Sequence, residues 1–147
     1  RGSNVMKEYL DRPEETAKTI TADGWLRTGD LGRMDEDGFI FVTGRIKELI
    51  IKGGENIAPR EVDEALLEHD AVLEAAAFPR TCKDYGQRVE ACVCLKKGRN
   101  VSENELREFC EGLIGAYKTP DHIYFLDDLP KGPSGKVQRM KLVDLTL

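Results

Sequence analysis

Three segments of the 147-residue sequence place a charged side chain beside glycine-rich backbone, and each could do chemistry. In residues 131–139, with the sequence KGPSGKVQR, Lys136 follows a glycine-proline stretch that cannot form regular structure. A lysine on such a loop can swing into a site and meet an anion as a point charge. The alternative is a solvated basic loop, because Lys131, Arg139 and Lys141 lie in the same acid-free run.

The other two segments come earlier in the chain. Residues 24–31, GWLRTGDL, put Asp30 directly after a glycine turn. A carboxylate there can accept hydrogen bonds from two neighbouring hydroxyls, such as those of a ribose, or it can simply cap a turn. Residues 44–57 contain Gly53-Gly54, whose bare backbone can approach a thin ligand or merely form a tight turn.

The elements that must position these segments follow from the hydrophobic pattern, which predicts a compact α+β unit over residues 47–147. The expected order of elements is a hairpin, a helix, two strands, a helix, a short strand, a loop and a closing helix. Together they would form a small sheet flanked by helices. The hairpin turns at Gly53-Gly54, Pro59 suits the first turn of a helix, and Ser102 opens a capping box. The expected later strands are 72–78, 88–96 and 122–126, and the closing helix is 140–145.

Side-chain spacing predicts which faces of these elements are buried. Along residues 88–96 the apolar side chains alternate with Glu90, Cys92, Cys94 and Lys96. Apolar residues at helical spacing predict a buried stripe on each of the two longer helices. These stripes are Val62, Ala65 and Leu66 on one helix and Leu106, Phe109, Cys110 and Leu113 on the other.

Residues 1–46 have few candidates for a core. A short helix is expected around residues 14–21, followed by a hairpin of residues 25–34 and 38–43 with turn residues at its tip. We therefore expect this β-rich segment to be part of something larger.

Composition excludes several classes of function. The 22 Lys and Arg residues against 27 Asp and Glu give a formal charge of -5, which argues against nucleic acid as the main partner. No stretch is apolar over the length that a membrane span needs, and the polar start carries no secretory signal. The four cysteines show no zinc spacing. Free thiols in a reducing compartment are expected, which predicts a cytoplasmic protein without a metal site in this chain.

Taken together and in this order, the three segments resemble the adenylate-forming superfamily. This superfamily includes acyl-CoA and aryl-CoA synthetases, luciferases and the adenylation domains of peptide synthetases. Residues 1–6 and 9–16 are similar to the family segment that precedes its ribose-binding aspartate. Residues 117–120, Tyr-Lys-Thr-Pro, are similar to another family signature, so the resemblance extends over nearly the whole chain.

The resemblance implies an ATP-dependent carboxylic acid–CoA ligase that runs two half-reactions. A carboxylate attacks the α-phosphate of Mg-ATP to give an acyl-adenylate and pyrophosphate, and the thiol of coenzyme A then displaces AMP to give the thioester. In such enzymes a large N-terminal domain holds ATP and the acid. A small C-terminal lid rotates between the two steps. Residues 1–46 would be the end of the large domain, and residues 47–147 the mobile lid.

By position, the resemblance also implies roles for individual residues. Asp30 would bind the ribose hydroxyls, and Arg45 would contact the nucleotide near ribose and phosphate. Lys47 would be the hinge of the lid. Lys136 would enter the site and neutralise charge between the carboxylate and the α-phosphate, which suits the joining of two anions. The residues implied at the narrow pantetheine tunnel are Gly53, Gly54, Glu55 and Asn56.

Much of the family pattern lies outside this sequence. The phosphate-binding loop, the Tyr-Gly-x-Thr-Glu segment with its magnesium-binding glutamate, and the acid pocket are absent. The expected partners are therefore the missing N-terminal domain of the same protein, a small carboxylic acid, ATP and coenzyme A. The isolated chain is expected to be inactive, and the Mg²⁺ ligand is expected in the missing domain.

Two other interpretations remain at this point. One is the C-terminal part of an adenylation domain that loads a carrier protein, although the sequence contains no Asp-Ser phosphopantetheine site. The other is a non-catalytic interaction module that kept the fold. The presence of both Lys136 and Gly53-Gly54 argues against the second interpretation, because a domain that had lost its catalytic role would need neither.

Overall fold

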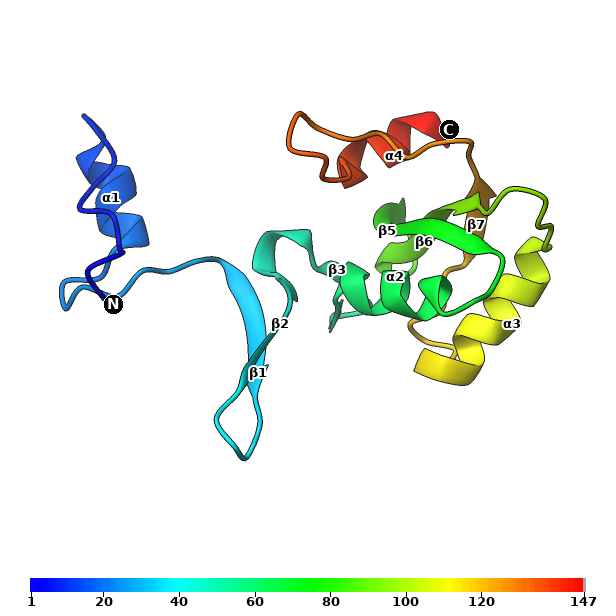
Figure 1. Cartoon of the computed structure of the whole chain (residues 1–147), viewed down its shortest axis with the longest axis horizontal. Helices are drawn as coiled ribbons and strands as arrows, with labels where there is room; N and C mark the ends of the chain where they lie inside the picture. Colours follow the sequence, from blue (N-terminus) through cyan, green and yellow to red (C-terminus); the bar gives the residue numbers. More distant parts are fainter. Residues whose placement is uncertain (147) are drawn as a thin grey trace. The chain divides into compact units, whose positions relative to one another are not determined.

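The computed structural model of the chain describes residues 1–146 and contains both helices and sheets, so the expected α+β class is confirmed. The chain divides into two compact units, which we call unit 1 (Arg1–Lys47) and unit 2 (Glu48–Leu147). Most elements of the two units are labelled in Figure 1.

Unit 1 consists of a short helix and a hairpin. Helix α1 spans Pro13–Thr19, and its proline occupies the first turn, where the missing amide costs no hydrogen bond. Strands β1 (Asp30–Met34) and β2 (Ile40–Arg45) form an antiparallel pair. The tip is closed by the Asp35 carboxylate, which accepts a 2.8 Å hydrogen bond from the Phe39 amide. The predicted hairpin is confirmed, but β1 begins later than expected.

Unit 1 has no core of its own. No residue of this unit is buried. The hairpin exposes a series of large apolar side chains, with Ile40 at 75% and Met34 at 70% exposure. The others in the series are Phe39, Phe41 and Val42. Because neighbouring strand residues point to opposite faces, both faces of the hairpin expose large apolar side chains, as expected for a segment that packs against other protein surfaces.

Unit 2 is built on one sheet whose centre is β6 (Gly86–Leu95). On one edge β6 pairs with antiparallel β5 (Val72–Cys82). On the other edge it pairs first with β3 (Ile50–Lys52) and farther along with parallel β7 (His122–Phe125). Strand β4 (Glu55–Ile57) completes the sheet beside β3.

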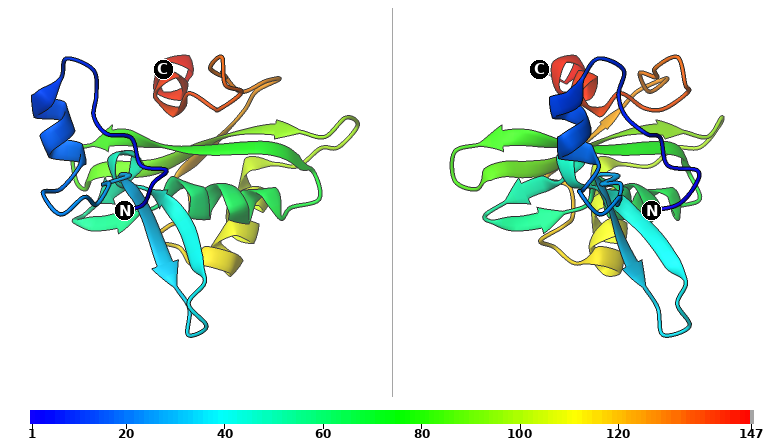
Figure 2. Two further views of the ribbon diagram at one scale, coloured as in Figure 1. Left: turned by 60° about the vertical axis from the view of Figure 1, so that its left-hand side comes forward. Right: turned by 90° about the vertical axis from the view of Figure 1, so that its left-hand side faces the viewer.

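Helices cover both faces of this sheet (Figure 2). Helices α2 (Pro59–Leu67) and α3 (Glu103–Ile114) lie on one face, and α4 (Arg139–Leu145) lies on the other. The first core joins the helices' apolar stripes to Val89, Ala91 and Val93 of β6. The second core joins Leu142 of α4 to the opposite face of β6. The second core consists of Ala76, Phe78, Cys92, Cys94, Leu129 and Leu142.

The helix signals are confirmed with one correction. Pro59 is the first residue of α2, and the Ser102–Glu105 capping box forms in both directions. Leu113, however, is 48% exposed, while Ile114 packs against the first core. The buried row of α3 therefore follows Leu106, Cys110 and Ile114, because residues four apart lie almost in line along a helix.

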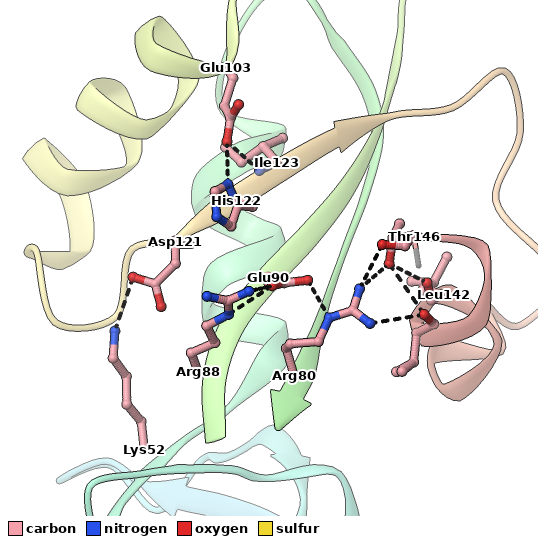
Figure 3. A network of polar contacts seen from close by, with 11 residues as sticks. Lys52, Arg80, Arg88, Glu90, Glu103, Asp121, His122, Ile123, Leu142 and Thr146 are labelled. Atoms are coloured by element: carbon pink, nitrogen blue, oxygen red, sulfur yellow. Dashed lines mark hydrogen bonds and ion pairs between the residues drawn. The ribbon is translucent and has the colours of Figure 1, made fainter. Parts of the chain in front are cut away.

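Arg80 connects the buried carboxylate of Glu90 in the sheet to helix α4 (Figure 3). Glu90 is fully buried, and its two oxygens meet Arg80 Nε at 2.8 Å and Arg88 Nε at 2.9 Å. The Arg80 guanidinium also donates to the backbone carbonyls of Val143 and Thr146 at 3.1 and 3.2 Å. Arg80 thus satisfies carbonyls at the C-terminal end of α4, where cations are favourable.

The four cysteines of the chain are expected to differ in reactivity. Burial raises the pKa of Cys92 and Cys110 to about 11 and raises that of Cys94 as well. Cys82, at the end of β5, is partly exposed. Because only the thiolate reacts, a brief thiol alkylation near pH 8 should label Cys82 alone, as counted by mass spectrometry. Urea should make all four reactive. Rapid labelling of Cys92 or Cys110 without urea would contradict the buried arrangement.

Candidate functional site

Lys136 lies on a tight loop at the start of α4. The loop is closed by a β-bridge between Lys131 and Val137 and by a 2.8 Å hydrogen bond from the Gly132 amide to the Lys136 carbonyl. Gly135 has a φ of +76°, which explains why glycine stands there. Lys136 itself is exposed, and its ammonium makes no hydrogen bond or ion pair within residues 1–146. It is therefore an available cation on an ordered loop.

The basic run that contains Lys136 is not a basic surface. The Lys131 ammonium lies 2.9 Å from Glu74 Oε2 and 3.0 Å from Asp128 Oδ1. Arg139 is paired with Asp63 at 2.5 Å. Acids therefore neutralise Lys131 and Arg139, whereas Lys136 and Lys141 make no ion pair within residues 1–146.

Gly53 and Gly54 form the turn between β3 and β4, and both have positive φ, +56° and +90°. A Cβ at Gly53 would lie 3.0 Å from the Tyr117 hydroxyl and 3.3 Å from Tyr85 Cδ1. A Cβ at Gly54 would meet nothing within 4 Å. Gly53 is thus required by both conformation and crowding, whereas Gly54 leaves its backbone open to solvent or to a ligand.

Hydrogen bonds between Tyr117 and Lys52 stabilise the β3–β4 turn. The Tyr117 hydroxyl donates a hydrogen bond to the Lys52 carbonyl, and the buried Lys52 ammonium donates to the Tyr117 carbonyl at 3.1 Å. The Lys52 ammonium also lies 3.7 Å from Asp121 Oδ1 (Figure 3). Desolvation and the nearby Glu55 carboxylate raise the pKa of the Tyr117 phenol, which keeps it a donor. Glu55 and Asn56 are both exposed on β4.

Asp30 and Arg45 face each other across the hairpin of unit 1. Their Cα atoms are register partners at the open end of β1 and β2, and Arg45 Nε lies 3.2 Å from Asp30 Oδ1. The turn before Asp30 uses Gly29 with a φ of +75°, and the Asp30 amide donates to the Thr28 hydroxyl. One arginine leaves the carboxylate with free lone pairs, so it can still accept hydrogen bonds from a ligand.

Lys47 lies in a single 3-10 turn, Ile46–Glu48, between β2 and β3. Unit 1 ends at Lys47, and unit 2 begins at Glu48. The Lys47 side chain is exposed. This position at the end of an element is one where a few φ/ψ changes could reorient two units.

The structure groups some of the predicted residues and separates others. Asp30 and Arg45 form one pair in unit 1, and the Gly53–Asn56 group forms one turn in unit 2. No hydrogen bond or ion pair among the described residues joins that turn to the Lys136 loop. Neither Tyr85 nor Tyr117 was predicted to belong to a site. Tyr117 is the first residue of the Tyr-Lys-Thr-Pro signature, whereas Tyr85 has no local signal, because only folding brings it next to Gly53.

The chain is similar to known proteins over nearly its whole length. It is 52% identical over 144 residues to a sulfoacetate–CoA ligase of Cupriavidus necator, covering 98% of this chain and 28% of that protein. It matches the structure of o-succinylbenzoate CoA synthetase from Bacillus subtilis, in complex with an acyl-adenylate intermediate, with a TM-score of 0.90 and 41% identity. That match covers 97% of this chain and 29% of the other.

A second structure, ATP-bound MatB from Rhodopseudomonas palustris, matches with a TM-score of 0.90 and 34% identity over 100% of this chain and 30% of that chain. The chain thus spans less than a third of the length of these relatives. Residues 61–136 match the family described as AMP-binding enzyme C-terminal domain. With more than half of its residues matched and the small sheet, its helices and the Lys136 loop in place, this chain belongs to the AMP-binding enzyme C-terminal domain family.

Proposed function

We propose that this chain is the C-terminal part of an ATP-dependent carboxylic acid–CoA ligase, which forms an acyl-adenylate and then a thioester. The observation that carries the proposal is Lys136, an exposed ammonium without a partner among residues 1–146, on a loop fixed at its base. Two of its three neighbours in the basic run, Lys131 and Arg139, are paired with acids. Similarity to a sulfoacetate–CoA ligase supports the same reaction class.

Residues 1–46 are then the end of the large N-terminal domain, and residues 47–147 are the lid. The absence of any buried residue in Arg1–Lys47 supports this division, since the exposed face of the hairpin needs a surface to cover it. Unit 2, in contrast, has two cores of its own. The large domain would supply the rest of the ATP and acid sites.

In the first half-reaction, Lys136 stabilises the negative charge that builds up as a carboxylate attacks the α-phosphate. Two anions repel each other, and a positioned cation lowers the barrier because it is already oriented before the reaction. Asp30 accepts hydrogen bonds from the ribose hydroxyls of ATP. Arg45 lies 3.2 Å from the Asp30 carboxylate, so it can fix that carboxylate and contact the nucleotide.

In the second half-reaction, the β3–β4 turn faces the site and its backbone lines the path of the pantetheine arm of coenzyme A. Gly54 suits this role because nothing lies within 4 Å of its missing Cβ. Glu55 and Asn56 follow on the exposed strand β4. A side chain at Gly54 would be forced into a strained φ of +90° and would project into this path.

Magnesium and localisation follow from the same proposal. Among residues 1–146 no group of three or more His, Cys, Asp or Glu side chains could hold a metal ion. In the proposed enzyme, the large domain supplies the Mg²⁺ ligand. Within the same residues no helix is long and apolar enough to cross a bilayer. Four free thiols are in keeping with a reducing compartment, and we assign the enzyme to the cytoplasm.

The test is an assay of the full-length protein with ATP, coenzyme A and a panel of carboxylic acids. The panel should begin with sulfoacetate and o-succinylbenzoate. We expect AMP, pyrophosphate and an acyl-CoA with at least one acid, and no turnover by the 147-residue chain alone. ATP turnover by the isolated chain would contradict the proposal. Adenylate formation with transfer only to a carrier protein, and never to coenzyme A, would indicate a carrier-loading adenylation domain instead.

Replacing Lys47 by proline in the full-length enzyme should impair one half-reaction and spare the other. Proline fixes φ near −65° and removes the amide donor, so it should favour one orientation of the lid. A bias of about 1.4 kcal/mol is enough for a tenfold loss in the step that needs the other orientation. Pyrophosphate release and the conversion of adenylate to thioester should be timed separately. Equal loss in both, with a lowered Tm, would indicate misfolding, and no loss in either would move the hinge elsewhere.

A further inference from the structure

Arg139 follows the Lys136 loop directly and is held by several side-chain hydrogen bonds. Only Val137 and Gln138 separate it from Lys136, and it is the first residue of α4. Its guanidinium donates to both carboxylate oxygens of Asp63 on α2, at 3.2 and 2.5 Å, and to the Ala77 carbonyl on β5 at 2.9 Å. Three bonds to two elements hold this side chain in a single orientation.

The partner of Arg139 is itself immobile. Asp63 is buried, and one of its oxygens also accepts a 2.6 Å hydrogen bond from the Ala77 amide. Burial raises the pKa of Asp63, and the hydrogen bonds and charge of Arg139 oppose that shift. Arg139 is therefore anchored to the sheet and to α2, and within the described residues the Asp63 carboxylate forms no ion pair with another cation.

A third contact connects Arg139 to the start of unit 2. Its Nε lies 3.6 Å from Oε2 of Glu48, which directly follows Lys47. On the other side, the Gln138 amide donates to the Pro130 carbonyl at 2.8 Å, which closes the Lys136 loop at its base. One guanidinium thus joins the segment after the proposed hinge to the loop that carries the proposed catalytic lysine.

We infer that Arg139 is a positioning residue for the adenylation step: it holds the Lys136 loop in a fixed place relative to the segment that follows Lys47. When the lid rotates, the ammonium then arrives at the same point each time. This inference rests on the proposed function. It concerns only the first half-reaction, because Lys136 has no role once the lid has turned the Gly53–Gly54 turn inward.

The test is Arg139→Lys in the full-length enzyme. Lysine keeps the charge but lacks the planar fork, so it cannot meet Asp63, Ala77 and Glu48 together. We expect adenylate formation to fall about 10- to 100-fold, the scale of a small misplacement of a reacting group. Thioester formation from pre-made adenylate should stay within about twofold of wild type. In a Lys136→Ala background, Arg139→Lys should cause no further loss, because both changes remove the same interaction.

The matched control is Arg80→Lys at the opposite end of α4. Arg80 also pairs with a buried carboxylate and bonds backbone carbonyls, but these lie at Val143 and Thr146, away from the loop. Arg80→Lys should lower the Tm, and any change in rate should be the same for the two half-reactions.

Equal effects of Arg80→Lys and Arg139→Lys on both half-reactions would overturn the inference, because Arg139 would then be merely structural. Additive losses in the double variant would overturn it too. If Lys136→Ala itself leaves adenylate formation intact, the proposed function fails first. If Lys136→Ala slows adenylate formation but Arg139→Lys leaves its rate unchanged, only the inference about Arg139 is wrong.

Discussion

Replacing Lys136 by alanine in the full-length enzyme is expected to slow adenylate formation by roughly 10²- to 10³-fold, the scale of losing one oriented charge-stabilising group. Conversion of a pre-made acyl-adenylate to the thioester should continue at the wild-type rate. The structure supports the first part because the Lys136 ammonium has no partner within residues 1–146 that would compete with the substrate. It also predicts an unchanged Tm, since no contact is lost.

The measurement is single-turnover kinetics of the two half-reactions, with Lys141→Ala as the control. Lys141 lies in the same basic run, is exposed and carries the same charge, so its removal changes the net charge equally. It should alter neither half-reaction by more than about twofold, as expected for a screened surface charge. Equal loss in both half-reactions for Lys136→Ala would show that the lysine acts in both lid orientations. No loss in either would make it a solvated loop residue.

Replacing Arg80 by alanine should destabilise the 147-residue chain by about 3 kcal/mol, the lower end of the usual cost of removing one partner of a buried ion pair, because Arg88 still contacts Glu90. The Arg80 side chain is 13% exposed, and Glu90 is fully buried. The change also removes the Arg80 hydrogen bonds to the carbonyls of Val143 and Thr146. Loss of helix α4 from the sheet should accompany the destabilisation. The measurement is urea unfolding followed by circular dichroism.

Arg88→Ala provides the comparison, because Arg88 contacts the same carboxylate but is 35% exposed. Water can partly replace it, so we expect a loss of about 1 kcal/mol. Its contacts in the structure do not include α4. Equal losses for the two variants would mean that Glu90 alone sets the stability. A loss below about 1 kcal/mol for Arg80→Ala would show that the contacts with α4 contribute little.

The sequence determined the local features of this protein. Pro59 at a first turn, the Ser102–Glu105 capping box and the glycines of the β3–β4 turn are set by backbone chemistry within a few residues. The element order of unit 2 followed from hydrophobic periods for the same reason. Lys136 could be selected because its loop contains glycine and proline, and because the three segments occur together.

Which polar groups meet depends on long-range packing, which local patterns do not reveal. The sequence pattern set Glu90, Cys92 and Cys94 on the face of β6 opposite the apolar one, yet α4 covers that face and buries all three. Asp63 and Arg139 stand far apart in the chain, and no local pattern relates them. A buried charge is tolerated only with a partner, and the partner comes from whichever element the fold brings near. Local spacing therefore fixed the elements and proposed the reactive lysine, whereas long-range packing chose the residues that hold it.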